Sequence, residues 1–306
     1  MKAITLVVIY NKKIEDSTTI KSLLLSNYTG DLYIFNNGPS AINVSASYLE
    51  LLQGKYSLIN IIEDVNNRPL STIYNDFLNA GDYDYYYLFD DDTTIPSNFF
   101  AAEQQIEYDL SLPIIVSAKS SDVVYPIVNN KVFHEREFPF NESDEVISIG
   151  SGLMVNKSLI LKFEKIGLKP FDERFALYGV DYSLFRRLPF LKRAGYAVRL
   201  GISGTLHHSL SSEENHISAF RKRERLIDVM LTKLHYSRRK GPLQLLSILK
   251  TLAEHAVKSD FQNFKMLLGV CLHREHPRST QYRNRLKNHN NIKLDKLDKL
   301  DKLDKE

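Results

Sequence analysis

The sequence predicts an α/β fold with a mostly parallel sheet in the first 220 residues. Three observations predict it: short apolar runs rich in β-branched or aromatic residues recur, each run stops at polar or turn-forming residues, and helix-like stretches separate them. Alternating strands and helices are joined by right-handed crossovers, which make the strands parallel. Ligands of such sheets bind beyond the carboxyl ends of the strands, so functional residues are expected there.

The expected elements follow one another along the chain. Residues 4–10 form a β-branched run without strict alternation, which suits a strand covered on both faces. After it come a helix that contains Ile20, Leu23 and Leu24, strands over 32–35 and 57–62, a helix over 71–80, an aromatic strand over 85–89 and a later helix over 182–191. The tyrosines of the aromatic run, Tyr83, Tyr85, Tyr86 and Tyr87, are expected to pack in the core.

Polar side chains follow three of these strands. They are Tyr10 and Asn11 after the first strand, Asn36 and Asn37 after the second, and Asp90, Asp91 and Asp92 after the aromatic strand. Three adjacent carboxylates repel one another, and a hard divalent cation such as Mg²⁺ or Mn²⁺ is the simplest counter-charge. The alternative is an Asp-rich loop that caps a helix beginning near Thr93 and Pro96.

Composition excludes two classes of protein. The chain has 306 residues, 43% hydrophobic and 25% charged, which is typical of a globular protein with a buried core. Its one cysteine, Cys271, excludes an intramolecular disulfide, and no apolar run reaches the roughly 18 residues that span a bilayer. The N-terminal apolar run is too short for a signal peptide, so a cytoplasmic protein is expected. Integral membrane proteins and disulfide scaffolds are therefore excluded.

Charge divides the chain into three expected parts. Residues 1–220 contain 19 Lys and Arg against 27 Asp and Glu, whereas residues 221–290 contain 16 against 5. The basic part also has apolar residues at helical spacing over 243–257 and 261–268, which predicts amphipathic helices. These helices would either lie on an anionic membrane face or pack on the preceding domain. Residues 291–306 repeat Leu-Asp-Lys and are expected to be a disordered, low-complexity tail.

The order and spacing of short motifs over about residues 3–225 resemble the family 2 nucleotide-sugar glycosyltransferases of GT-A fold, most closely their rhamnosyltransferase-like branch. The matching positions are Tyr10-Asn11, Asn36-Asn37-Gly38, Asn67 with Asn75, Phe89-Asp90-Asp91-Asp92-Thr93 with Pro96, Gly150-Ser151-Gly152-Leu153-Met154, Phe171-Asp172-Glu173-Arg174-Phe175, Val180-Asp181 with Arg187, Ala194-Gly195-Tyr196 and a late histidine. Three positions depart from the family pattern: Asn36 replaces an acidic residue, Pro69 a glycine and Val180 a glutamate. The resemblance implies a GT-A (Rossmann-like) mixed sheet flanked by helices, with a helical C-terminal extension.

The resemblance also implies a reaction. It indicates an inverting, metal-dependent transferase that moves a sugar, with rhamnose expected, from a nucleoside-diphosphate donor to a saccharide or lipid-linked acceptor in bacterial surface polysaccharide synthesis. It assigns the general base to Asp181 and the divalent cation, Mg²⁺ or Mn²⁺, to Asp92 and His208. It places the donor against Tyr10, Asn11, Asn37, Asn67, Asp90, Asp91 and Arg223. An anionic membrane surface is a further expected partner, and nucleic acid is not.

Other interpretations stay open beside this one. Asp181 opens the helix over 182–191 and would also suit a helix cap, His208 would suit a structural histidine, and Arg223 belongs to a basic helix face. A metal-dependent nucleotidyltransferase should carry a glycine-rich phosphate loop after the first strand. A binding module would leave Asp92 and Asp181 more than about 15 Å apart, too far for one sugar and a metal to bridge. Another UDP- or dTDP-sugar is the alternative donor.

Overall fold

The computed structural model describes residues 2–100, 108–134, 140–141, 143–209, 218–238 and 240–288. The chain divides into two compact units. The first unit contains residues 1–67, 72–172 and 180–218, and the second contains residues 68–71, 173–179 and 219–306. The predicted tail over 291–306 lies outside the described residues.

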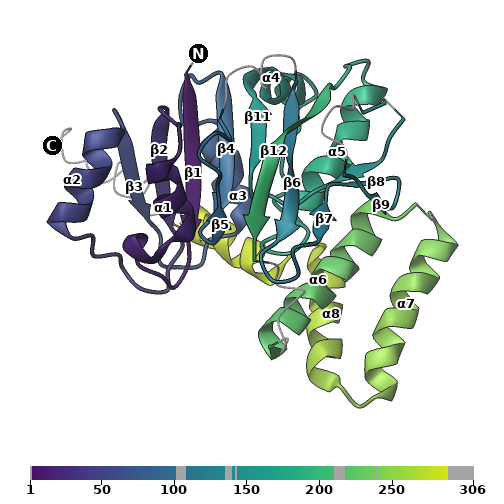
Figure 1. The fold of residues 1–306 in the computed structure, drawn as a ribbon. Helices are drawn as coiled ribbons and strands as arrows, with labels where there is room; N and C mark the ends of the chain where they lie inside the picture. The colour runs from purple at the N-terminus through teal and green to yellow at the C-terminus, as the bar shows by residue number, and fades with distance from the viewer. Residues whose placement is uncertain are drawn as a thin grey trace, which may run out of the picture. The chain divides into compact units, whose positions relative to one another are not determined.

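A mixed, mostly parallel sheet forms the centre of the first unit (Figure 1). Its strand order is β3 (Ile59–Glu63), β2 (Asp31–Asn36), β1 (Ala3–Ile9), β4 (Tyr85–Asp90), β11 (Leu153–Asn156), β6 (Leu110–Ser117), β12 (Leu200–His208) and β5 (Thr93–Thr94), with β7 (Val123–Tyr125) also paired to β6. Strands β3, β2, β1 and β4 are parallel, β11 is antiparallel between β4 and β6, and β6 and β12 are parallel again. The fold class predicted from the sequence is confirmed.

Helices connect and flank these strands. They are α1 (Thr18–Leu25), α2 (Ala46–Lys55), α3 (Leu70–Leu78), α4 (Lys157–Lys165) and α5 (Val180–Arg193), with a short 3₁₀ turn, η1 (Ile14–Asp16), before α1. Side-chain caps begin three of them, because Ser17 accepts a hydrogen bond from the Ile20 amide, Ser45 one from the Tyr48 amide and Asn156 one from the Ser158 amide. The strand tyrosines Tyr85, Tyr86 and Tyr87 are buried, as predicted, whereas Tyr83 precedes β4 and is only half-buried.

Two elements differ from the expectations. The helix α2 was not predicted, and its ten residues bury only Leu52. Thr93 and Thr94 form the short strand β5 and do not lead into a helix, because they pair with His208 and His207 of β12. A separate small sheet contains β8 (Ile127–Val128), β9 (Lys131–Val132) and β10 (Val146–Ile147).

The described residues from 219 onward in the second unit are mainly helical. It contains α6 (Ala219–Tyr236), α7 (Pro242–Val257), α8 (Phe261–His273) and a further helix over 277–288. The two amphipathic helices predicted from the sequence correspond to α7 and α8. None of the helices in the described ranges is long and apolar enough to cross a membrane.

Candidate active site

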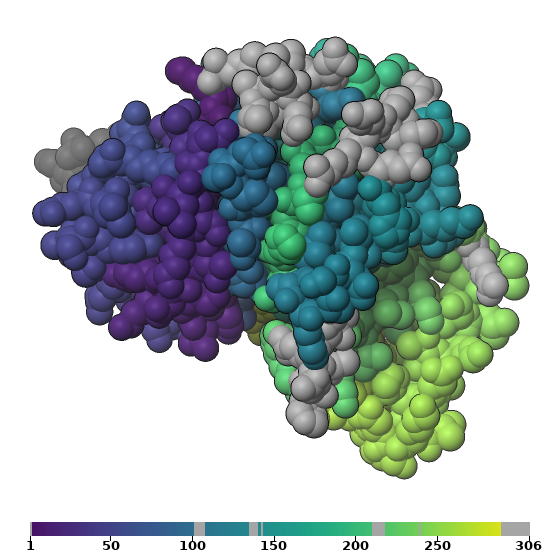
Figure 2. Space-filling view, in the orientation of Figure 1, coloured from purple at the N-terminus to yellow at the C-terminus, as the bar shows by residue number. Residues whose placement is uncertain are grey.

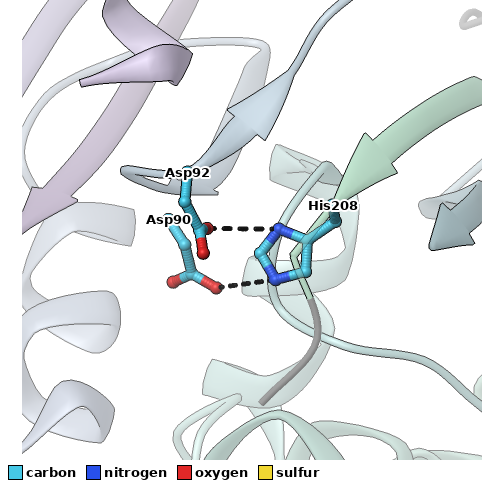
Figure 3. A group of neighbouring side chains, drawn as sticks. All are labelled: Asp90, Asp92 and His208. Carbon is cyan, nitrogen blue, oxygen red and sulfur yellow. Dashed lines mark ion pairs between the residues drawn. The ribbon is translucent and has the colours of Figure 1, made fainter. Parts of the chain in front are cut away.

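Three side chains that can ligate a metal meet at one end of the sheet. Asp90 ends β4, Asp92 follows two residues later, and His208 ends β12 (Figure 3). His208 Nδ1 lies 3.3 Å from Asp92 Oδ1, and His208 Nε2 lies 3.9 Å from Asp90 Oδ2. One ligand atom from each residue lies within 4.8 Å of the others. Figure 3 shows the imidazole ring facing both carboxylates, so the three residues form a compact candidate cation site.

Strand pairing explains why these residues meet. The chain leaves β4 at Asp90 and turns directly into β5, whose Thr93 is the register partner of His208 on β12. Thr93 and His208 are 115 residues apart in the sequence. The two aspartates are close in the sequence, and His208 joins them through this long-range strand pairing.

Buried hydroxyl groups hold the histidine ring in place. Thr93 Oγ1 is hydrogen-bonded to His208 Nδ1 at 2.9 Å and to Ser151 Oγ at 2.6 Å. The Ser151 hydroxyl in turn accepts a hydrogen bond of 3.1 Å from the Asp90 amide. A partner on one ring nitrogen fixes the orientation of an imidazole and leaves the other nitrogen for a metal, here Nε2 on the Asp90 side.

Burial and nearby negative charge destabilise the ionised forms of Asp90 and Asp92. Desolvation by the surrounding protein, with the nearby charges of Asp92 and Asp91, raises the pKa of Asp90 to about 6, although His208 opposes the shift. Burial, with the charge of Asp91, also raises the pKa of Asp92. Their side chains remain 41% and 37% exposed, so the site lies deep among protein atoms yet is open to solvent.

The ligand atoms of Asp90, Asp92 and His208 suit a divalent cation. Asp92 Oδ1 is buried and accepts no hydrogen bond from the described residues. Two carboxylates and an imidazole are ligands that suit Mn²⁺, while Mg²⁺ would use mainly the carboxylate oxygens. A cation would favour the charged form of both carboxyl groups.

Asp91 is arranged differently from its neighbours. Its Oδ1 lies 2.5 Å from Lys12 Nζ, and its Oδ2 accepts a hydrogen bond of 3.3 Å from the Tyr10 amide. The middle carboxylate of the triplet therefore already has a counter-charge and anchors the loop after β1. Its charge still raises the pKa of both Asp90 and Asp92. A direct contact of Asp91 with a sugar-nucleotide donor stays a prediction.

Asp181 lies in the first turn of α5, close to Tyr74 of α3. A Cβ atom built on Gly150 would lie 2.6 Å from Asp181 Oδ1 and 3.3 Å from the Tyr74 hydroxyl oxygen, so the glycine makes room for both side chains. Burial and the negative charges of Asp90 and Asp181 raise the pKa of the Tyr74 hydroxyl well above its ordinary value. The role of Asp181 as general base stays a prediction.

The other first-unit residues that are expected to contact the sugar-nucleotide donor lie near the carboxyl ends of β1 and β2 or just after β3. The Asn11 amide donates to the Gly38 carbonyl at 2.7 Å, and the amide of the buried Asn37 donates to the Ile9 carbonyl at 2.8 Å. Tyr10 is exposed, and Asn67 has a left-handed backbone with φ of 52°. Their contacts with a donor stay predictions.

Arg223 belongs to the second unit. It lies on α6, and its guanidinium group donates a hydrogen bond to Gln262 Oε1 of α8. A contact of Arg223 with a diphosphate therefore stays a prediction.

Two residues of the matched motifs have structural roles. The Asn75 side chain accepts a hydrogen bond from the Phe171 amide at 3.0 Å and donates one to the Phe171 carbonyl at 2.9 Å. Arg187 Nη2 lies 3.1 Å from Asp172 Oδ1 in a buried ion pair. Both residues hold the loop that leads toward Asp181.

Sequence reasoning did not single out four residues that shape the site: Lys12, Tyr74, Thr93 and Ser151. Thr93 and Ser151 stand inside matched motifs, and Tyr74 directly precedes Asn75, so their positions were already marked. Lys12 had no such mark, because its partner Asp91 is 79 residues away.

Comparisons with known proteins give structural likenesses at low identity. No protein-family model and no curated protein matches the chain. Residues 1–349 of S. aureus TarS are similar with a TM-score of 0.47 and 12% identity, over 90% of this chain and 93% of that chain. GalNAc-T7 with UDP, GalNAc and Mn²⁺ gives 0.45 and 10%, over 75% of this chain and 48% of that one. The mannosyltransferase PcManGT from Pyrobaculum calidifontis, in complex with GDP-Man and Mn²⁺, gives 0.44 and 11%, over 92% and 82%.

Proposed function

We propose that this chain is a metal-dependent glycosyltransferase that uses a nucleoside-diphosphate sugar as donor. The observation that carries the proposal is the cluster of Asp90, Asp92 and His208 at the end of the sheet, with the carboxylate of Asp181 nearby. A sugar transfer needs two separate groups: one that neutralises the departing diphosphate and one that takes a proton from the acceptor. The site supplies a candidate for each.

Each residue has a defined task in this reaction. Asp90, Asp92 and His208 would hold the cation, which when bound supplies positive charge to the diphosphate leaving group. Asp181 accepts the proton of the acceptor hydroxyl as that oxygen attacks the anomeric carbon. Because the attack comes from the face opposite the leaving group, the configuration at that carbon is inverted.

The finer proposal concerns donor and acceptor. We take dTDP-rhamnose as the first donor to test, with a saccharide or lipid-linked saccharide of a bacterial surface polysaccharide, O-antigen or capsule, as acceptor. Its support is the motif resemblance, in which Val180 stands before Asp181 where many relatives carry glutamate. Other dTDP- and UDP-sugars follow in the same test.

A nucleotide-sugar panel tests the function. Each sugar nucleotide is incubated with the protein and Mn²⁺ or Mg²⁺, and the release of nucleoside diphosphate is measured. The correct donor at 100 times its dissociation constant should stabilise the protein by about 2.7 kcal/mol, which a melting curve detects. If no sugar nucleotide shifts the melting temperature in the presence of metal, the proposed function is wrong.

Two substitutions separate the proposed roles. Asp181→Asn should leave metal-dependent donor binding nearly intact and lower turnover by about 10² to 10⁴, the usual contribution of a general base. Asp92→Asn should weaken donor binding as well as turnover, because it removes a cation ligand. Near-normal transfer by a folded Asp181→Asn protein would refute its assignment as the base.

We also propose that the second unit binds an anionic membrane surface. On α7, Leu243, Leu246 and Val257 are 59%, 63% and 85% exposed, with the exposed Lys250 on the same side and the buried Ile248 on the opposite side. Figure 2 shows the yellow-green atoms of this region at the surface. An apolar face beside cationic residues, in a segment with 16 basic and 5 acidic residues, suits the boundary between lipid chains and anionic head groups.

Vesicle sedimentation of the full chain tests this surface. Binding to phosphatidylglycerol vesicles should exceed binding to phosphatidylcholine vesicles and should weaken as salt is added. Leu246→Asp should reduce binding, whereas Leu51→Asp, at an exposed leucine of α2 in the first unit, should leave it unchanged. Equal binding by both variants, or none by the unmodified protein at low salt, would refute the proposal.

A further inference from the structure

The turn that carries both carboxylate ligands is held by the beginning of helix α1. Thr19, in the first turn of α1, is fully buried, and its hydroxyl donates a hydrogen bond of 2.5 Å to the Asp90 carbonyl. The same oxygen accepts a hydrogen bond of 2.9 Å from the Thr93 amide. One hydroxyl therefore joins the backbone on both sides of Asp91 and Asp92.

A hydroxyl group is suited to this bridge. It has one proton to donate and lone pairs that accept, so it can satisfy a carbonyl and an amide at the same time. Asp90 ends β4 and Thr93 begins β5, and the two residues between them form a turn. By joining the two ends of the turn, the Thr19 hydroxyl restricts the positions that the Asp90 and Asp92 side chains can take.

Ser17 supports the same turn from the beginning of α1. Its hydroxyl donates a hydrogen bond of 2.9 Å to the Asp91 carbonyl, and it also caps the helix. The consecutive carbonyls of Asp90 and Asp91 are thus each held by a side chain that follows β1. The third ligand is linked to this network, because Thr93 Oγ1 is hydrogen-bonded to His208 Nδ1.

We propose that Thr19 is a positioning residue, whose hydroxyl holds Asp90 and Asp92 at the spacing that a divalent cation requires. This inference rests on the proposed function, because it concerns the same site. A group that orients metal ligands influences affinity without touching the metal, and its loss commonly weakens metal binding 10- to 100-fold. The role belongs to the hydroxyl and not to the methyl group, so the two parts of the side chain can be tested separately.

Two substitutions divide the Thr19 side chain. Thr19→Val removes the hydroxyl and keeps the shape, whereas Thr19→Ser keeps the hydroxyl and removes the methyl group. Thr251→Val is the matched control, because Thr251 of α7 in the second unit is also buried, and its hydroxyl also donates to a carbonyl, that of Ser247, and accepts from a nitrogen, that of Lys233. Mn²⁺ affinity of the full chain is measured by the decrease in the free-ion electron paramagnetic resonance signal, with melting curves on the same samples.

We expect Thr19→Val to weaken Mn²⁺ binding by about 10- to 100-fold, and Thr19→Ser and Thr251→Val to change it by less than about twofold. All three variants remove buried atoms or hydrogen bonds and should lower the melting temperature. A purely structural role would therefore appear in the melting curves alone, whereas a positioning role appears in the Mn²⁺ affinity of the folded protein.

Several results would overturn the inference. Unchanged Mn²⁺ affinity in folded Thr19→Val, or an equal loss in Thr19→Ser or in Thr251→Val, would each refute the positioning role while leaving the proposed function standing. A Thr19→Val protein that fails to fold while Thr251→Val folds would show that the hydroxyl serves the fold. An unmodified protein that binds no Mn²⁺ would refute the metal-dependent function as well.

Discussion

Binding of Mn²⁺ to the full chain should weaken about tenfold when the pH is lowered from 7 to 5, because protons compete with the cation for Asp90. The pKa of Asp90 is about 6 in the cation-free protein. At pH 7 about nine-tenths of the molecules therefore carry an ionised Asp90, and at pH 5 about one-tenth do. The raised pKa of Asp92 acts in the same direction.

The raised pKa of Asp90 makes the cation-free protein less stable as the pH rises, whereas it makes Mn²⁺ binding stronger. Since the folded pKa of Asp90 exceeds its ordinary value of 3.8, the folded chain holds more protons than the unfolded chain between about pH 4 and 6. The contribution of this group to the free energy of unfolding therefore falls as the pH rises through that window. Bound cation should offset the loss, so the stabilisation by Mn²⁺ should grow toward neutral pH.

Isothermal titration with Mn²⁺ at constant ionic strength measures this dependence. Repeating the titration in two buffers of different ionisation enthalpy reports the protons released on binding, which should be most numerous near pH 5. Asp90→Asn should lose most of the dependence, and Asp82→Asn, at an exposed carboxylate paired with Lys157, should retain it. A flat affinity between pH 5 and 7, or an equal slope in Asp90→Asn, would refute the reasoning.

The remaining predictions concern a close approach and a buried ion pair. Gly150→Ala should lower turnover by about 100-fold at nearly unchanged donor affinity, because its Cβ would displace Asp181 Oδ1, 2.6 Å away. Gly54→Ala, whose Cβ would meet no atom within 4 Å, is the control and should leave steady-state kinetics unchanged. Arg187→Met should lower the free energy of unfolding in urea by about 3 to 5 kcal/mol, because it leaves the buried Asp172 without its cation. A loss below about 1 kcal/mol would contradict this account of the pair.

Local sequence was sufficient for the strands at the beginning of the chain. The runs over 32–35 and 85–89 lie within β2 and β4, because apolar residues continue up to a turn or an acidic residue and stop there. The helix α2 gave no comparable pattern, since its exposed Leu51 and single buried Leu52 break the helical stripe. The antiparallel position of β11 in the sheet depends on pairings between distant residues, which local patterns do not contain.

The sequence predicted those residues of the candidate site that stand at the end of a predicted strand. Asp90 and Asp92 stand where a buried aromatic run stops, but their closeness in the sequence suited a helix-capping loop as well as a cation, and the motif resemblance decided for the cation. His208 was chosen through the motif resemblance alone, because nothing near it in the chain shows that β12 ends beside β5. The pairing of Thr93 with His208 also overrode the local preference of a Thr-Thr-Ile-Pro segment to begin a helix.

Because β5 pairs with β12, the cation site is complete only after the chain has been synthesised as far as His208. Asp90 and Asp92 are made early, whereas His208 enters only when β12 has joined the sheet beside Thr93. An unfinished chain that stops before residue 200 would contain both carboxylates but lack the imidazole and the edge that fixes it. A cation that binds afterwards would link the segment of Asp90 and Asp92 to the segment of His208. Its binding free energy would then stabilise the complete fold. Cation binding would thus show that β12 has paired with β5.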